Sequence, residues 1–341
     1  MNIALVYVGA RAPKYFWKNL SYITKTFPDH QVVFITDQSS DIKKSKKLGF
    51  NAWQSTSVHD SWAKIRQHMD HPLDFRQGFW FLTIARLVAL AEFMNENPDV
   101  PLIHVEGDVW LSPQFPLIEF KKVIKNFAFP LESPNVGVAS TLFIRNAAAA
   151  KDLLSFAEKY LSENPSGTDM KILGQLALSH PEQCLILPTS TPWTELKNNQ
   201  QREMDRRFFE NIDIFRGLFD GVQWGAYMLG EDPRNHRGIR YVFNRAIPRE
   251  VRPWEYSLSI TPSGLPAVTV DSQVIPLFSL HVHTKNPKLF SDKRMSNAWR
   301  RRLIQEKNGL RKEIVVKVLL IQIFKALVRR GNKIFIFMSN N

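Results

Sequence analysis

The sequence has very little cysteine and lacks long uncharged apolar runs. Its one cysteine, Cys184, excludes an intramolecular disulfide and a zinc site built on several cysteines, and it fits a reducing compartment. No run of about 18 uncharged apolar residues is present, so we expect no transmembrane helix. The apolar start of the chain lacks the basic residues that open an export signal, and a first strand explains it better. These absences favour a cytoplasmic globular protein.

Net charge is almost absent from most of the chain and is concentrated near its end. The whole sequence carries +13, of which residues 293–333 carry +11 from 13 lysines and arginines and two acids. The remaining 300 residues carry only +2. A neutral body with a basic tail indicates an appended contact for an anionic surface rather than a nucleic-acid enzyme. Because no known nucleic-acid-binding motif is present either, we expect no nucleic acid as partner.

Apolar strands alternate with helices of regular spacing, which predicts an α/β fold. Residues 3–9 and 31–37 read as buried strands on either side of a helix over 13–27. Near-continuous apolar strands in such a β-α-β arrangement predict a mostly parallel sheet with helices on both faces. Further strands are expected over 102–105, 126–130, 136–146 and 274–287, and further helices over 75–99, 147–167, 168–180 and 217–235.

Two acids, Glu106 and Asp108, follow the strand expected over 102–105, with Gly107 between them. In an open α/β sheet, ligands bind beyond the carboxyl ends of the strands. Two carboxylates there can together hold Mg²⁺ or Mn²⁺, which prefer hard oxygen ligands. Gly107 would let the backbone approach a ligand closely. The alternative is a solvated turn after a strand, and the spacing of the acids alone does not decide between the two.

The motif LHVHTKN places two histidines and a lysine at the end of the last expected strand. His281 and His283 alternate, so they point to the same side of that strand, and Lys285 continues the side. An imidazole can add a nitrogen ligand to a carboxylate-bound metal, and a lysine can neutralise phosphate. The alternative is a pair of edge histidines satisfied by hydrogen bonds.

Three further charged residues are candidates for the site. Arg86 lies in an apolar stretch, where a charge needs a partner, and it can contact either a diphosphate or one of the acids; an exposed helix residue is the alternative. Asp220 stands near two glycines and is a candidate acid or base on the acceptor side; helix capping is the alternative. Asp169 can orient a sugar hydroxyl or, more simply, interact with the dipole at the start of its helix.

Taken together, the motifs resemble GT-A-type nucleotide-sugar glycosyltransferases, above all bacterial enzymes that add sugars to capsule or lipopolysaccharide. The resemblance covers residues 1–288 and rests on the order of its motifs along the chain. These motifs are IALVYVGA, ARLVALAEF, IHVEGDVWL, GVASTLFIRN, TDMKIL, FDGVQWGAYMLGEDPRN and LHVHTKN.

The resemblance implies a GT-A-like, Rossmann-type mixed sheet, mostly parallel and flanked by helices. It divides residues 1–288 into a nucleotide-sugar half, 1–150, and an acceptor half, 151–288, and leaves 289–341 as a basic helical tail. The implied enzyme is a hexosyltransferase that moves a sugar from a nucleotide-diphosphate sugar to a glycan or lipid-linked acceptor in polysaccharide biosynthesis. Its implied cofactor is Mn²⁺ or Mg²⁺.

The resemblance also implies roles for individual residues. The family's metal-binding DxD motif matches here with Glu106 in place of the first aspartate, so Asp108 is the ligand that follows the pattern. The family's late histidine and lysine map to His283 and Lys285, with His281 beside them. Val8, Gly9 and Ala10 would meet the nucleotide base or ribose, and Arg86 would face the diphosphate. Asp220 or Asp169 could supply the base that an inverting enzyme needs.

The basic tail and the scaffold leave alternatives open. We expect the tail to lie on an anionic membrane, at the inner face of the cytoplasmic membrane, with Trp299 and three neighbouring arginines adding to the contact. Alternatively, the tail helix packs back on the domain. A non-catalytic protein that binds anions or RNA through this tail is one rival function. A nucleotidyltransferase is the other, although its glycine-rich phosphate loop is matched only by VGARAPK, with one glycine.

Overall fold

The fold is taken from a computed structural model of the 341-residue chain. The structure describes residues 1–56, 58–72, 78–192, 205–230, 251–253 and 256–307.

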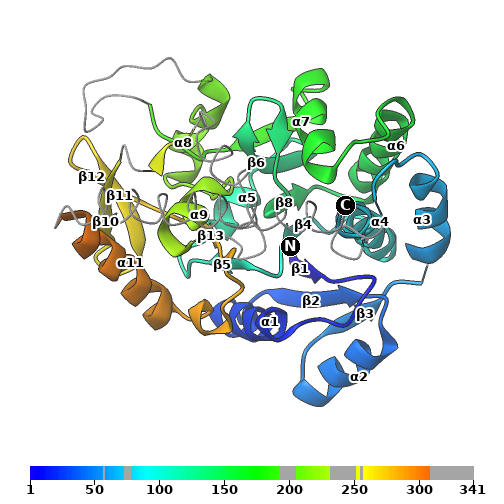
Figure 1. The fold of residues 1–341 in the computed structure, drawn as a ribbon, viewed down its shortest axis with the longest axis horizontal. Coiled ribbons are helices and arrows are strands. Elements are labelled where there is room, and N and C mark those ends of the chain that lie inside the picture. Colours follow the sequence, from blue (N-terminus) through cyan, green and yellow to red (C-terminus); the bar gives the residue numbers. More distant parts are fainter. Residues whose placement is uncertain (57, 73–77, 193–204, 231–250, 254–255, 308–341) are drawn as a thin grey trace, which may run out of the picture.

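The main sheet confirms the expected mixed, mostly parallel arrangement. Its strand order is β3-β2-β1-β4-β8-β6-β7, with β9 paired to β6 (Figure 1). The first four strands of that order are parallel, β8 runs antiparallel to β4 and β6, and β9 is again parallel to β6. The strands are β1 (Asn2–Val6), β2 (Gln31–Thr36), β3 (Ala52–Gln54), β4 (Leu102–Val105), β6 (Phe127–Ser133), β7 (Val136–Gly137), β8 (Thr141–Ile144) and β9 (Cys184–Leu187).

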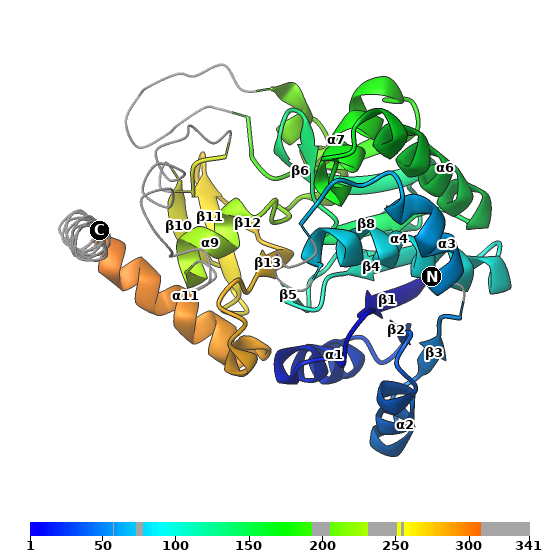
Figure 2. The same cartoon turned by 45° about the vertical axis from the view of Figure 1, so that its right-hand side comes forward.

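Helices cover both faces of this sheet, as the apolar strands predict. On one face lie α1 (Lys14–Thr26) and α2 (Ser39–Leu48), and on the other lie α3 (Val58–Arg66), α4 (Phe79–Glu96), α6 (Ala147–Glu163) and α7 (Asp169–Ser179) (Figures 1 and 2). The helix α4 is apolar on most sides because it lies between the sheet and α6. The Thr168 hydroxyl accepts from the Lys171 N–H at 3.3 Å and caps α7.

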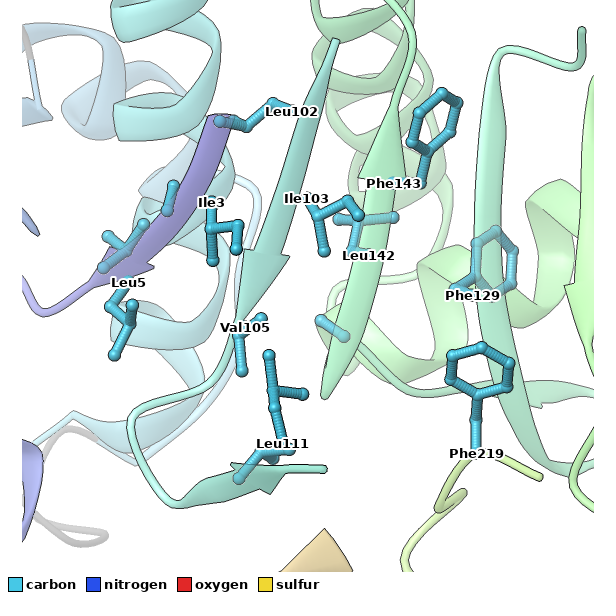
Figure 3. Close-up of a cluster of buried hydrophobic side chains, with 14 of the residues drawn as sticks. Ile3, Leu5, Leu102, Ile103, Val105, Leu111, Phe129, Leu142, Phe143 and Phe219 are labelled. Carbon is cyan, nitrogen blue, oxygen red and sulfur yellow. The ribbon is translucent and has the colours of Figure 1, made fainter. Parts of the chain in front are cut away.

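The hydrophobic core runs across the middle of the sheet. Ile3 of β1 is opposite Ile103 of β4, which is opposite Phe143 of β8, and none of the three is more than 1% exposed (Figure 3). Residues of this row come from three strands that lie far apart in the sequence. Their burial fixes the register of the strands, because a slip by one residue would turn each side chain to the other face.

A second group of elements lies beside the carboxyl edge of β4. After the acid pair, the chain forms β5 (Val109–Leu111), which leaves the main sheet and pairs antiparallel with β13 (Ser279–His281). Next to it are a three-stranded sheet, several short helices and the longer helix α11 (Figure 2). These elements are β10 (Ser257–Ile260), β11 (Pro266–Val270), β12 (Gln273–Pro276), α5 (Leu117–Phe120), α8 (Ile212–Phe215), α9 (Gln223–Leu229), α11 (Asp292–Lys307), and the 3-10 helices η2 (Arg206–Phe208) and η5 (Pro287–Leu289).

Two predicted single strands are each divided in the structure. The stretch 136–146 forms β7 and β8, and the stretch 274–287 forms β12 and β13, which pair in different sheets. Between β12 and β13 the chain bonds to Leu218, whose N–H donates to the Pro276 carbonyl and whose carbonyl accepts from the Phe278 N–H. The change of partner is a long-range event, so the apolar pattern does not reveal it.

The first turns of the basic tail pack on the domain. Met295 and Trp299 of α11 are fully buried, and the Trp299 indole N–H donates to the Ser259 carbonyl of β10 at 2.7 Å. The expectation that Trp299 reaches a membrane is therefore wrong. Residues 308–333, the rest of the predicted membrane contact, lie outside the described residues. None of the helices in the described ranges combines the length and hydropathy that a membrane span needs.

Candidate functional site

The site lies where the order of the sheet reverses, between β1 and β4. From β1 the chain proceeds to β2 on one side, and β4 occupies the other side. Since both strands are parallel, their carboxyl ends meet at one edge, which is where ligands bind in open α/β sheets. Val8–Ala10 follow β1 at this edge, and Glu106 and Asp108 follow β4. The fold thus brings the predicted nucleotide segment and the acid pair to neighbouring strand ends.

The turn that carries the acids is fixed from the side of α1. The Asn19 amide donates to the carbonyls of Gly107 and Val109, at 3.2 Å and 2.7 Å. A Cβ atom on Gly107 would lie 2.4 Å from the Phe16 ring, so no larger residue fits there without a shift. The close neighbour that requires this glycine is Phe16 itself. Glu106 and Asp108 therefore project from a turn whose backbone has little freedom.

Glu106 is the centre of a buried ion-pair network. One of its oxygens contacts the Arg86 guanidinium of α4, and the other accepts from His281 Nε2 at 2.8 Å. The second terminal nitrogen of Arg86 contacts Asp169 Oδ2 at 2.7 Å. Burial favours the neutral acid, but Arg86 and His281 outweigh it and hold the pKa of Glu106 well below its ordinary value. Glu106 is ionised at neutral pH, and Arg86 links it to the start of α7.

Asp108 is paired with a different cation. Lys285 Nζ lies 2.6 Å from Asp108 Oδ2 and 5.1 Å from the centre of the Tyr15 ring. Burial opposes ionisation of Asp108, yet the positive charges of Lys285 and His281 lower its pKa. Burial and the nearby Asp108 charge raise the pKa of the Tyr15 phenol. Tyr15 thus forms one wall of the acid pair, a role for which its sequence context gave no signal.

The two histidines share a side, as expected, but they do different things. Their rings are stacked, with centres 4.8 Å apart and planes 13° apart. His281 donates to Glu106. Burial opposes the charged imidazole, but this bond together with the negative charges of Glu106, Asp108 and Asp220 raises the pKa of His281 to about 9. His283 Nε2 donates to the Val222 carbonyl at 3.2 Å, and burial and the charge of His281 lower the pKa of His283. His281, not His283, is the imidazole that contacts the acids.

A divalent cation fits the residues at this edge. Glu106, Asp108 and His281 each offer one ligand atom, and the three atoms lie within 4.8 Å of one another. Two carboxylate oxygens with one imidazole nitrogen form a donor set that suits Mg²⁺ or Mn²⁺. His283, also predicted as a ligand, is not part of this group. The geometry favours His281 as the third ligand, provided that a bound metal displaces the proton that His281 shares with Glu106.

Asp220 is fully buried, and its carboxylate contacts backbone groups of α9 and β13. Its carboxylate accepts from three backbone N–H groups, those of Trp224, Gly225 and His281, at 3.0, 2.7 and 2.8 Å. A Cβ atom on Gly225 would lie 2.1 Å from the His281 carbonyl, so glycine lets α9 approach β13. Asp220 therefore joins the start of α9 to the strand that carries His281.

Strained backbone stands between Asp220 and α9. Val222 has a φ of +88°, which is rare for a β-branched residue. Its carbonyl accepts the His283 bond described above, and strain of this kind persists where the surrounding structure enforces it. Nothing in the sequence around Val222 predicts this conformation.

The segment after β1 is positioned by a glycine and an aspartate. Gly9 has a φ of +80°, and its N–H donates to Asp37 Oδ1 at 3.0 Å. A Cβ atom there would lie 2.2 Å from Leu82 of α4. Val8 is buried, whereas Gly9 is exposed at the edge of the sheet. Gly9 and Ala10 are thus placed where a ligand can reach their backbone.

Comparisons with known proteins show that this chain is similar in structure to several solved proteins. No protein-family model matches the sequence, and neither does any curated protein. Galactosyltransferase LgtC, solved with donor and acceptor sugar analogues, is 12% identical over 55% of this chain and 73% of its own, with a TM-score of 0.39. The PaToxG glycosyltransferase is 12% identical over 53% of this chain and 69% of its own, with a TM-score of 0.33.

A protein with a different activity is similar to the same degree. The inositol-1-phosphate CTP transferase from T. maritima is 11% identical over 52% of this chain and 81% of its own, with a TM-score of 0.31. Glycosyltransferases and a nucleotidyltransferase are therefore both among the structures that this chain resembles. Scores of this size assign no function, so the roles of residues rest on the geometry above.

Proposed function

We propose that this chain is a glycosyltransferase of the GT-A type, which moves a sugar from a nucleotide-diphosphate sugar to a glycan or lipid-linked acceptor. One observation carries the proposal. Two acids, a histidine and a lysine, from segments about 175 residues apart in the sequence, meet at the carboxyl ends of the neighbouring strands β1 and β4. A carboxylate pair with cations beside it is suited to hold a metal and a diphosphate together.

The chemistry follows from the charge of the leaving group. The bond between the sugar's anomeric carbon and the diphosphate oxygen breaks, and its electron pair stays on that oxygen. The acceptor hydroxyl forms the new glycosidic bond and loses its proton. Glu106, Asp108 and His281 would hold a divalent cation, which would supply positive charge against the diphosphate. Lys285, whose side chain is 29% exposed, supplies a second positive charge that can reach the leaving phosphate.

The other predicted catalytic residues are better placed to support the site than to react. Asp220 is 0% exposed and accepts from three backbone N–H groups, which favours a positioning role. Asp169 is 3% exposed and is paired with Arg86. Arg86 itself contacts two carboxylates, so we assign it to orienting Glu106 rather than to the diphosphate. No base for the acceptor is assigned among these residues.

The finer parts of the proposal rest on the sequence resemblance. We assign residues 1–150 mainly to the donor and 151–288 mainly to the acceptor, with His281 and Lys285 crossing to the donor side. We assign the enzyme to hexosyl transfer in bacterial surface polysaccharide synthesis.

Peripheral membrane contact is the finer proposal for the tail. The outward face of α11 carries four exposed bases, Lys293, Arg294, Arg300 and Arg301, with exposed Ile304 beside them. Such a face suits anionic headgroups. Reversing all four charges to glutamate in the full chain should weaken sedimentation with phosphatidylglycerol vesicles. The matched control reverses four exposed lysines outside α11, Lys43, Lys46, Lys151 and Lys171. Equal losses in both variants would contradict a specific role for α11.

The main test is a panel of nucleotide sugars with Mn²⁺. We expect one of them to raise the melting temperature and to be hydrolysed slowly, and Asp108→Asn to abolish both effects. Asp152→Asn, an exposed acid on α6, is the matched control and should behave as wild type. The proposal fails if no nucleotide sugar binds, or if Asp108→Asn changes nothing. Release of pyrophosphate from a nucleoside triphosphate and a sugar phosphate would instead identify a nucleotidyltransferase.

A further inference from the structure

The candidate metal ligands already have partners within the protein. Glu106 contacts Arg86 and His281, and Asp108 contacts Lys285. A divalent cation that binds Asp108 must therefore compete with a lysine that is part of the chain. The two acids differ in this respect, because Arg86 is buried and fixed by Asp169, whereas Lys285 reaches solvent.

Lys285 is held in place from its backbone. Its φ is +52°, and its N–H donates to the Val282 carbonyl at 2.7 Å. The Val282 N–H in turn donates to the Asp108 carbonyl at 2.7 Å. The segment that carries Lys285 is thus bonded to the turn that carries Asp108. The backbone of Lys285 therefore stays near Asp108 whether or not the two side chains are paired.

The side chain of Lys285, in contrast to its backbone, can exchange one anion for another. Four carbons separate the fixed backbone from the ammonium group, and the face of the Tyr15 ring offers a cation a favourable neighbour along the way. A diphosphate placed at this edge offers Lys285 a stronger anion than Asp108 does. Once Lys285 turns to the diphosphate, Asp108 is available to a metal.

We propose that Lys285 keeps the affinity of the free protein for divalent cations low, and that a nucleoside diphosphate raises this affinity by drawing Lys285 away from Asp108. The inference rests on the proposed function and adds the order in which the metal and the donor bind. The metal joins with the donor instead of residing in the free protein. Because coupling between two ligands is reciprocal, Mn²⁺ raises the affinity for the diphosphate by the same factor.

The test measures Mn²⁺ binding directly, by calorimetry or by the electron paramagnetic resonance signal of free Mn²⁺, without a sugar donor. With Mn²⁺ alone, Lys285→Met should bind roughly tenfold more tightly than wild type. Lys288→Met is the matched control, because Lys288 is exposed three residues further on and its loss changes the net charge equally. It should bind as wild type does. Asp108→Asn in the Lys285→Met background should remove the gain.

A second measurement adds UDP, GDP or CDP to the same titrations. In wild type, the diphosphate that binds should tighten Mn²⁺ binding, and in Lys285→Met the gain should be smaller, because the lysine no longer has to move. Equal Mn²⁺ affinity in wild type and Lys285→Met would overturn the inference, as would an equal gain in Lys288→Met. Neither result touches the proposed function, which fails only if no nucleotide sugar binds in the separate panel.

Discussion

The acid turn at Glu106–Asp108 and the loop at Asp220 both hold carboxylates beneath the surface, but they neutralise them with different groups. The acids of the turn contact side chains, those of Arg86, His281 and Lys285. The Asp220 carboxylate instead accepts from backbone N–H groups of α9 and β13. A side chain can rotate away when a ligand arrives, whereas a backbone group cannot move without the element that carries it. The first arrangement suits a binding site, and the second suits the structural support of that site.

The largest loss of stability should come from substitution of Asp220. Asp220→Ala leaves three buried N–H groups without their acceptor, and each such loss costs about 1–3 kcal/mol. We expect the free energy of unfolding to fall by about 5 kcal/mol in urea denaturation. Asp220→Asn keeps one acceptor oxygen and should lose less. A loss below about 1 kcal/mol for Asp220→Ala would show that these donors find other acceptors.

Arg86→Met tests the most buried part of the acid network. It removes the cation that Asp169 contacts and one of the two that Glu106 contacts, and breaking a buried pair in this way costs about 3–5 kcal/mol. Neutralising both acids in the same chain, with Glu106→Gln and Asp169→Asn, should recover part of the loss, since the two carboxylates that lose Arg86 are then neutral. Urea denaturation of the single and triple variants measures this. No recovery in the triple variant would contradict the ion-pair explanation.

The contrast between the two regions also marks what the sequence could predict. The strands β1, β2 and β4 and the helices α1, α4, α6 and α7 follow from local apolar spacing and end signals such as Asn97-Pro98, so their predicted ranges agree with the structure within a few residues. Asp108 and Lys285 could be named as site residues because a strand end concentrates ligands.

The pairing of these residues could not be predicted, since it depends on contacts far apart in the chain. Lys285 and Asp108 are 177 residues apart, and Asp220 and His281 are 61 residues apart. The choice of His281 over His283 is set by the register of β13 against β5, in which His281 lies opposite Val109. The backbone partners of Asp220 depend on the close approach that Gly225 allows, and no local pattern encodes it.

His281 should make the stability of the metal-free protein depend on pH. Its pKa is about 9 in the folded protein, above the ordinary 6.5, because the Glu106 bond and the nearby carboxylate charges together outweigh burial. The resulting stabilisation is fully present below pH 6.5 and is lost as the pH rises through 9, and it amounts to roughly 3 kcal/mol. Unfolding in EDTA across this range measures the loss, which should be absent in His281→Gln. Imidazole NMR should show His281 charged and His283 neutral at pH 7; the reverse order would contradict the assignment.

The smallest change in the free energy of unfolding should come from the Lys285–Asp108 pair, which we expect a diphosphate to separate. Lys285 Nζ and Asp108 lie near the surface, where an ion pair contributes about 1 kcal/mol or less. Lys285→Met should therefore change the free energy of unfolding by no more than this, close to the Lys288→Met control. A loss as large as that of Asp220→Ala would mean that Lys285 holds the fold together and is not free to leave Asp108. A small loss means that the protein gives up little stability when Lys285 turns toward a diphosphate, as an exchangeable counter-ion requires.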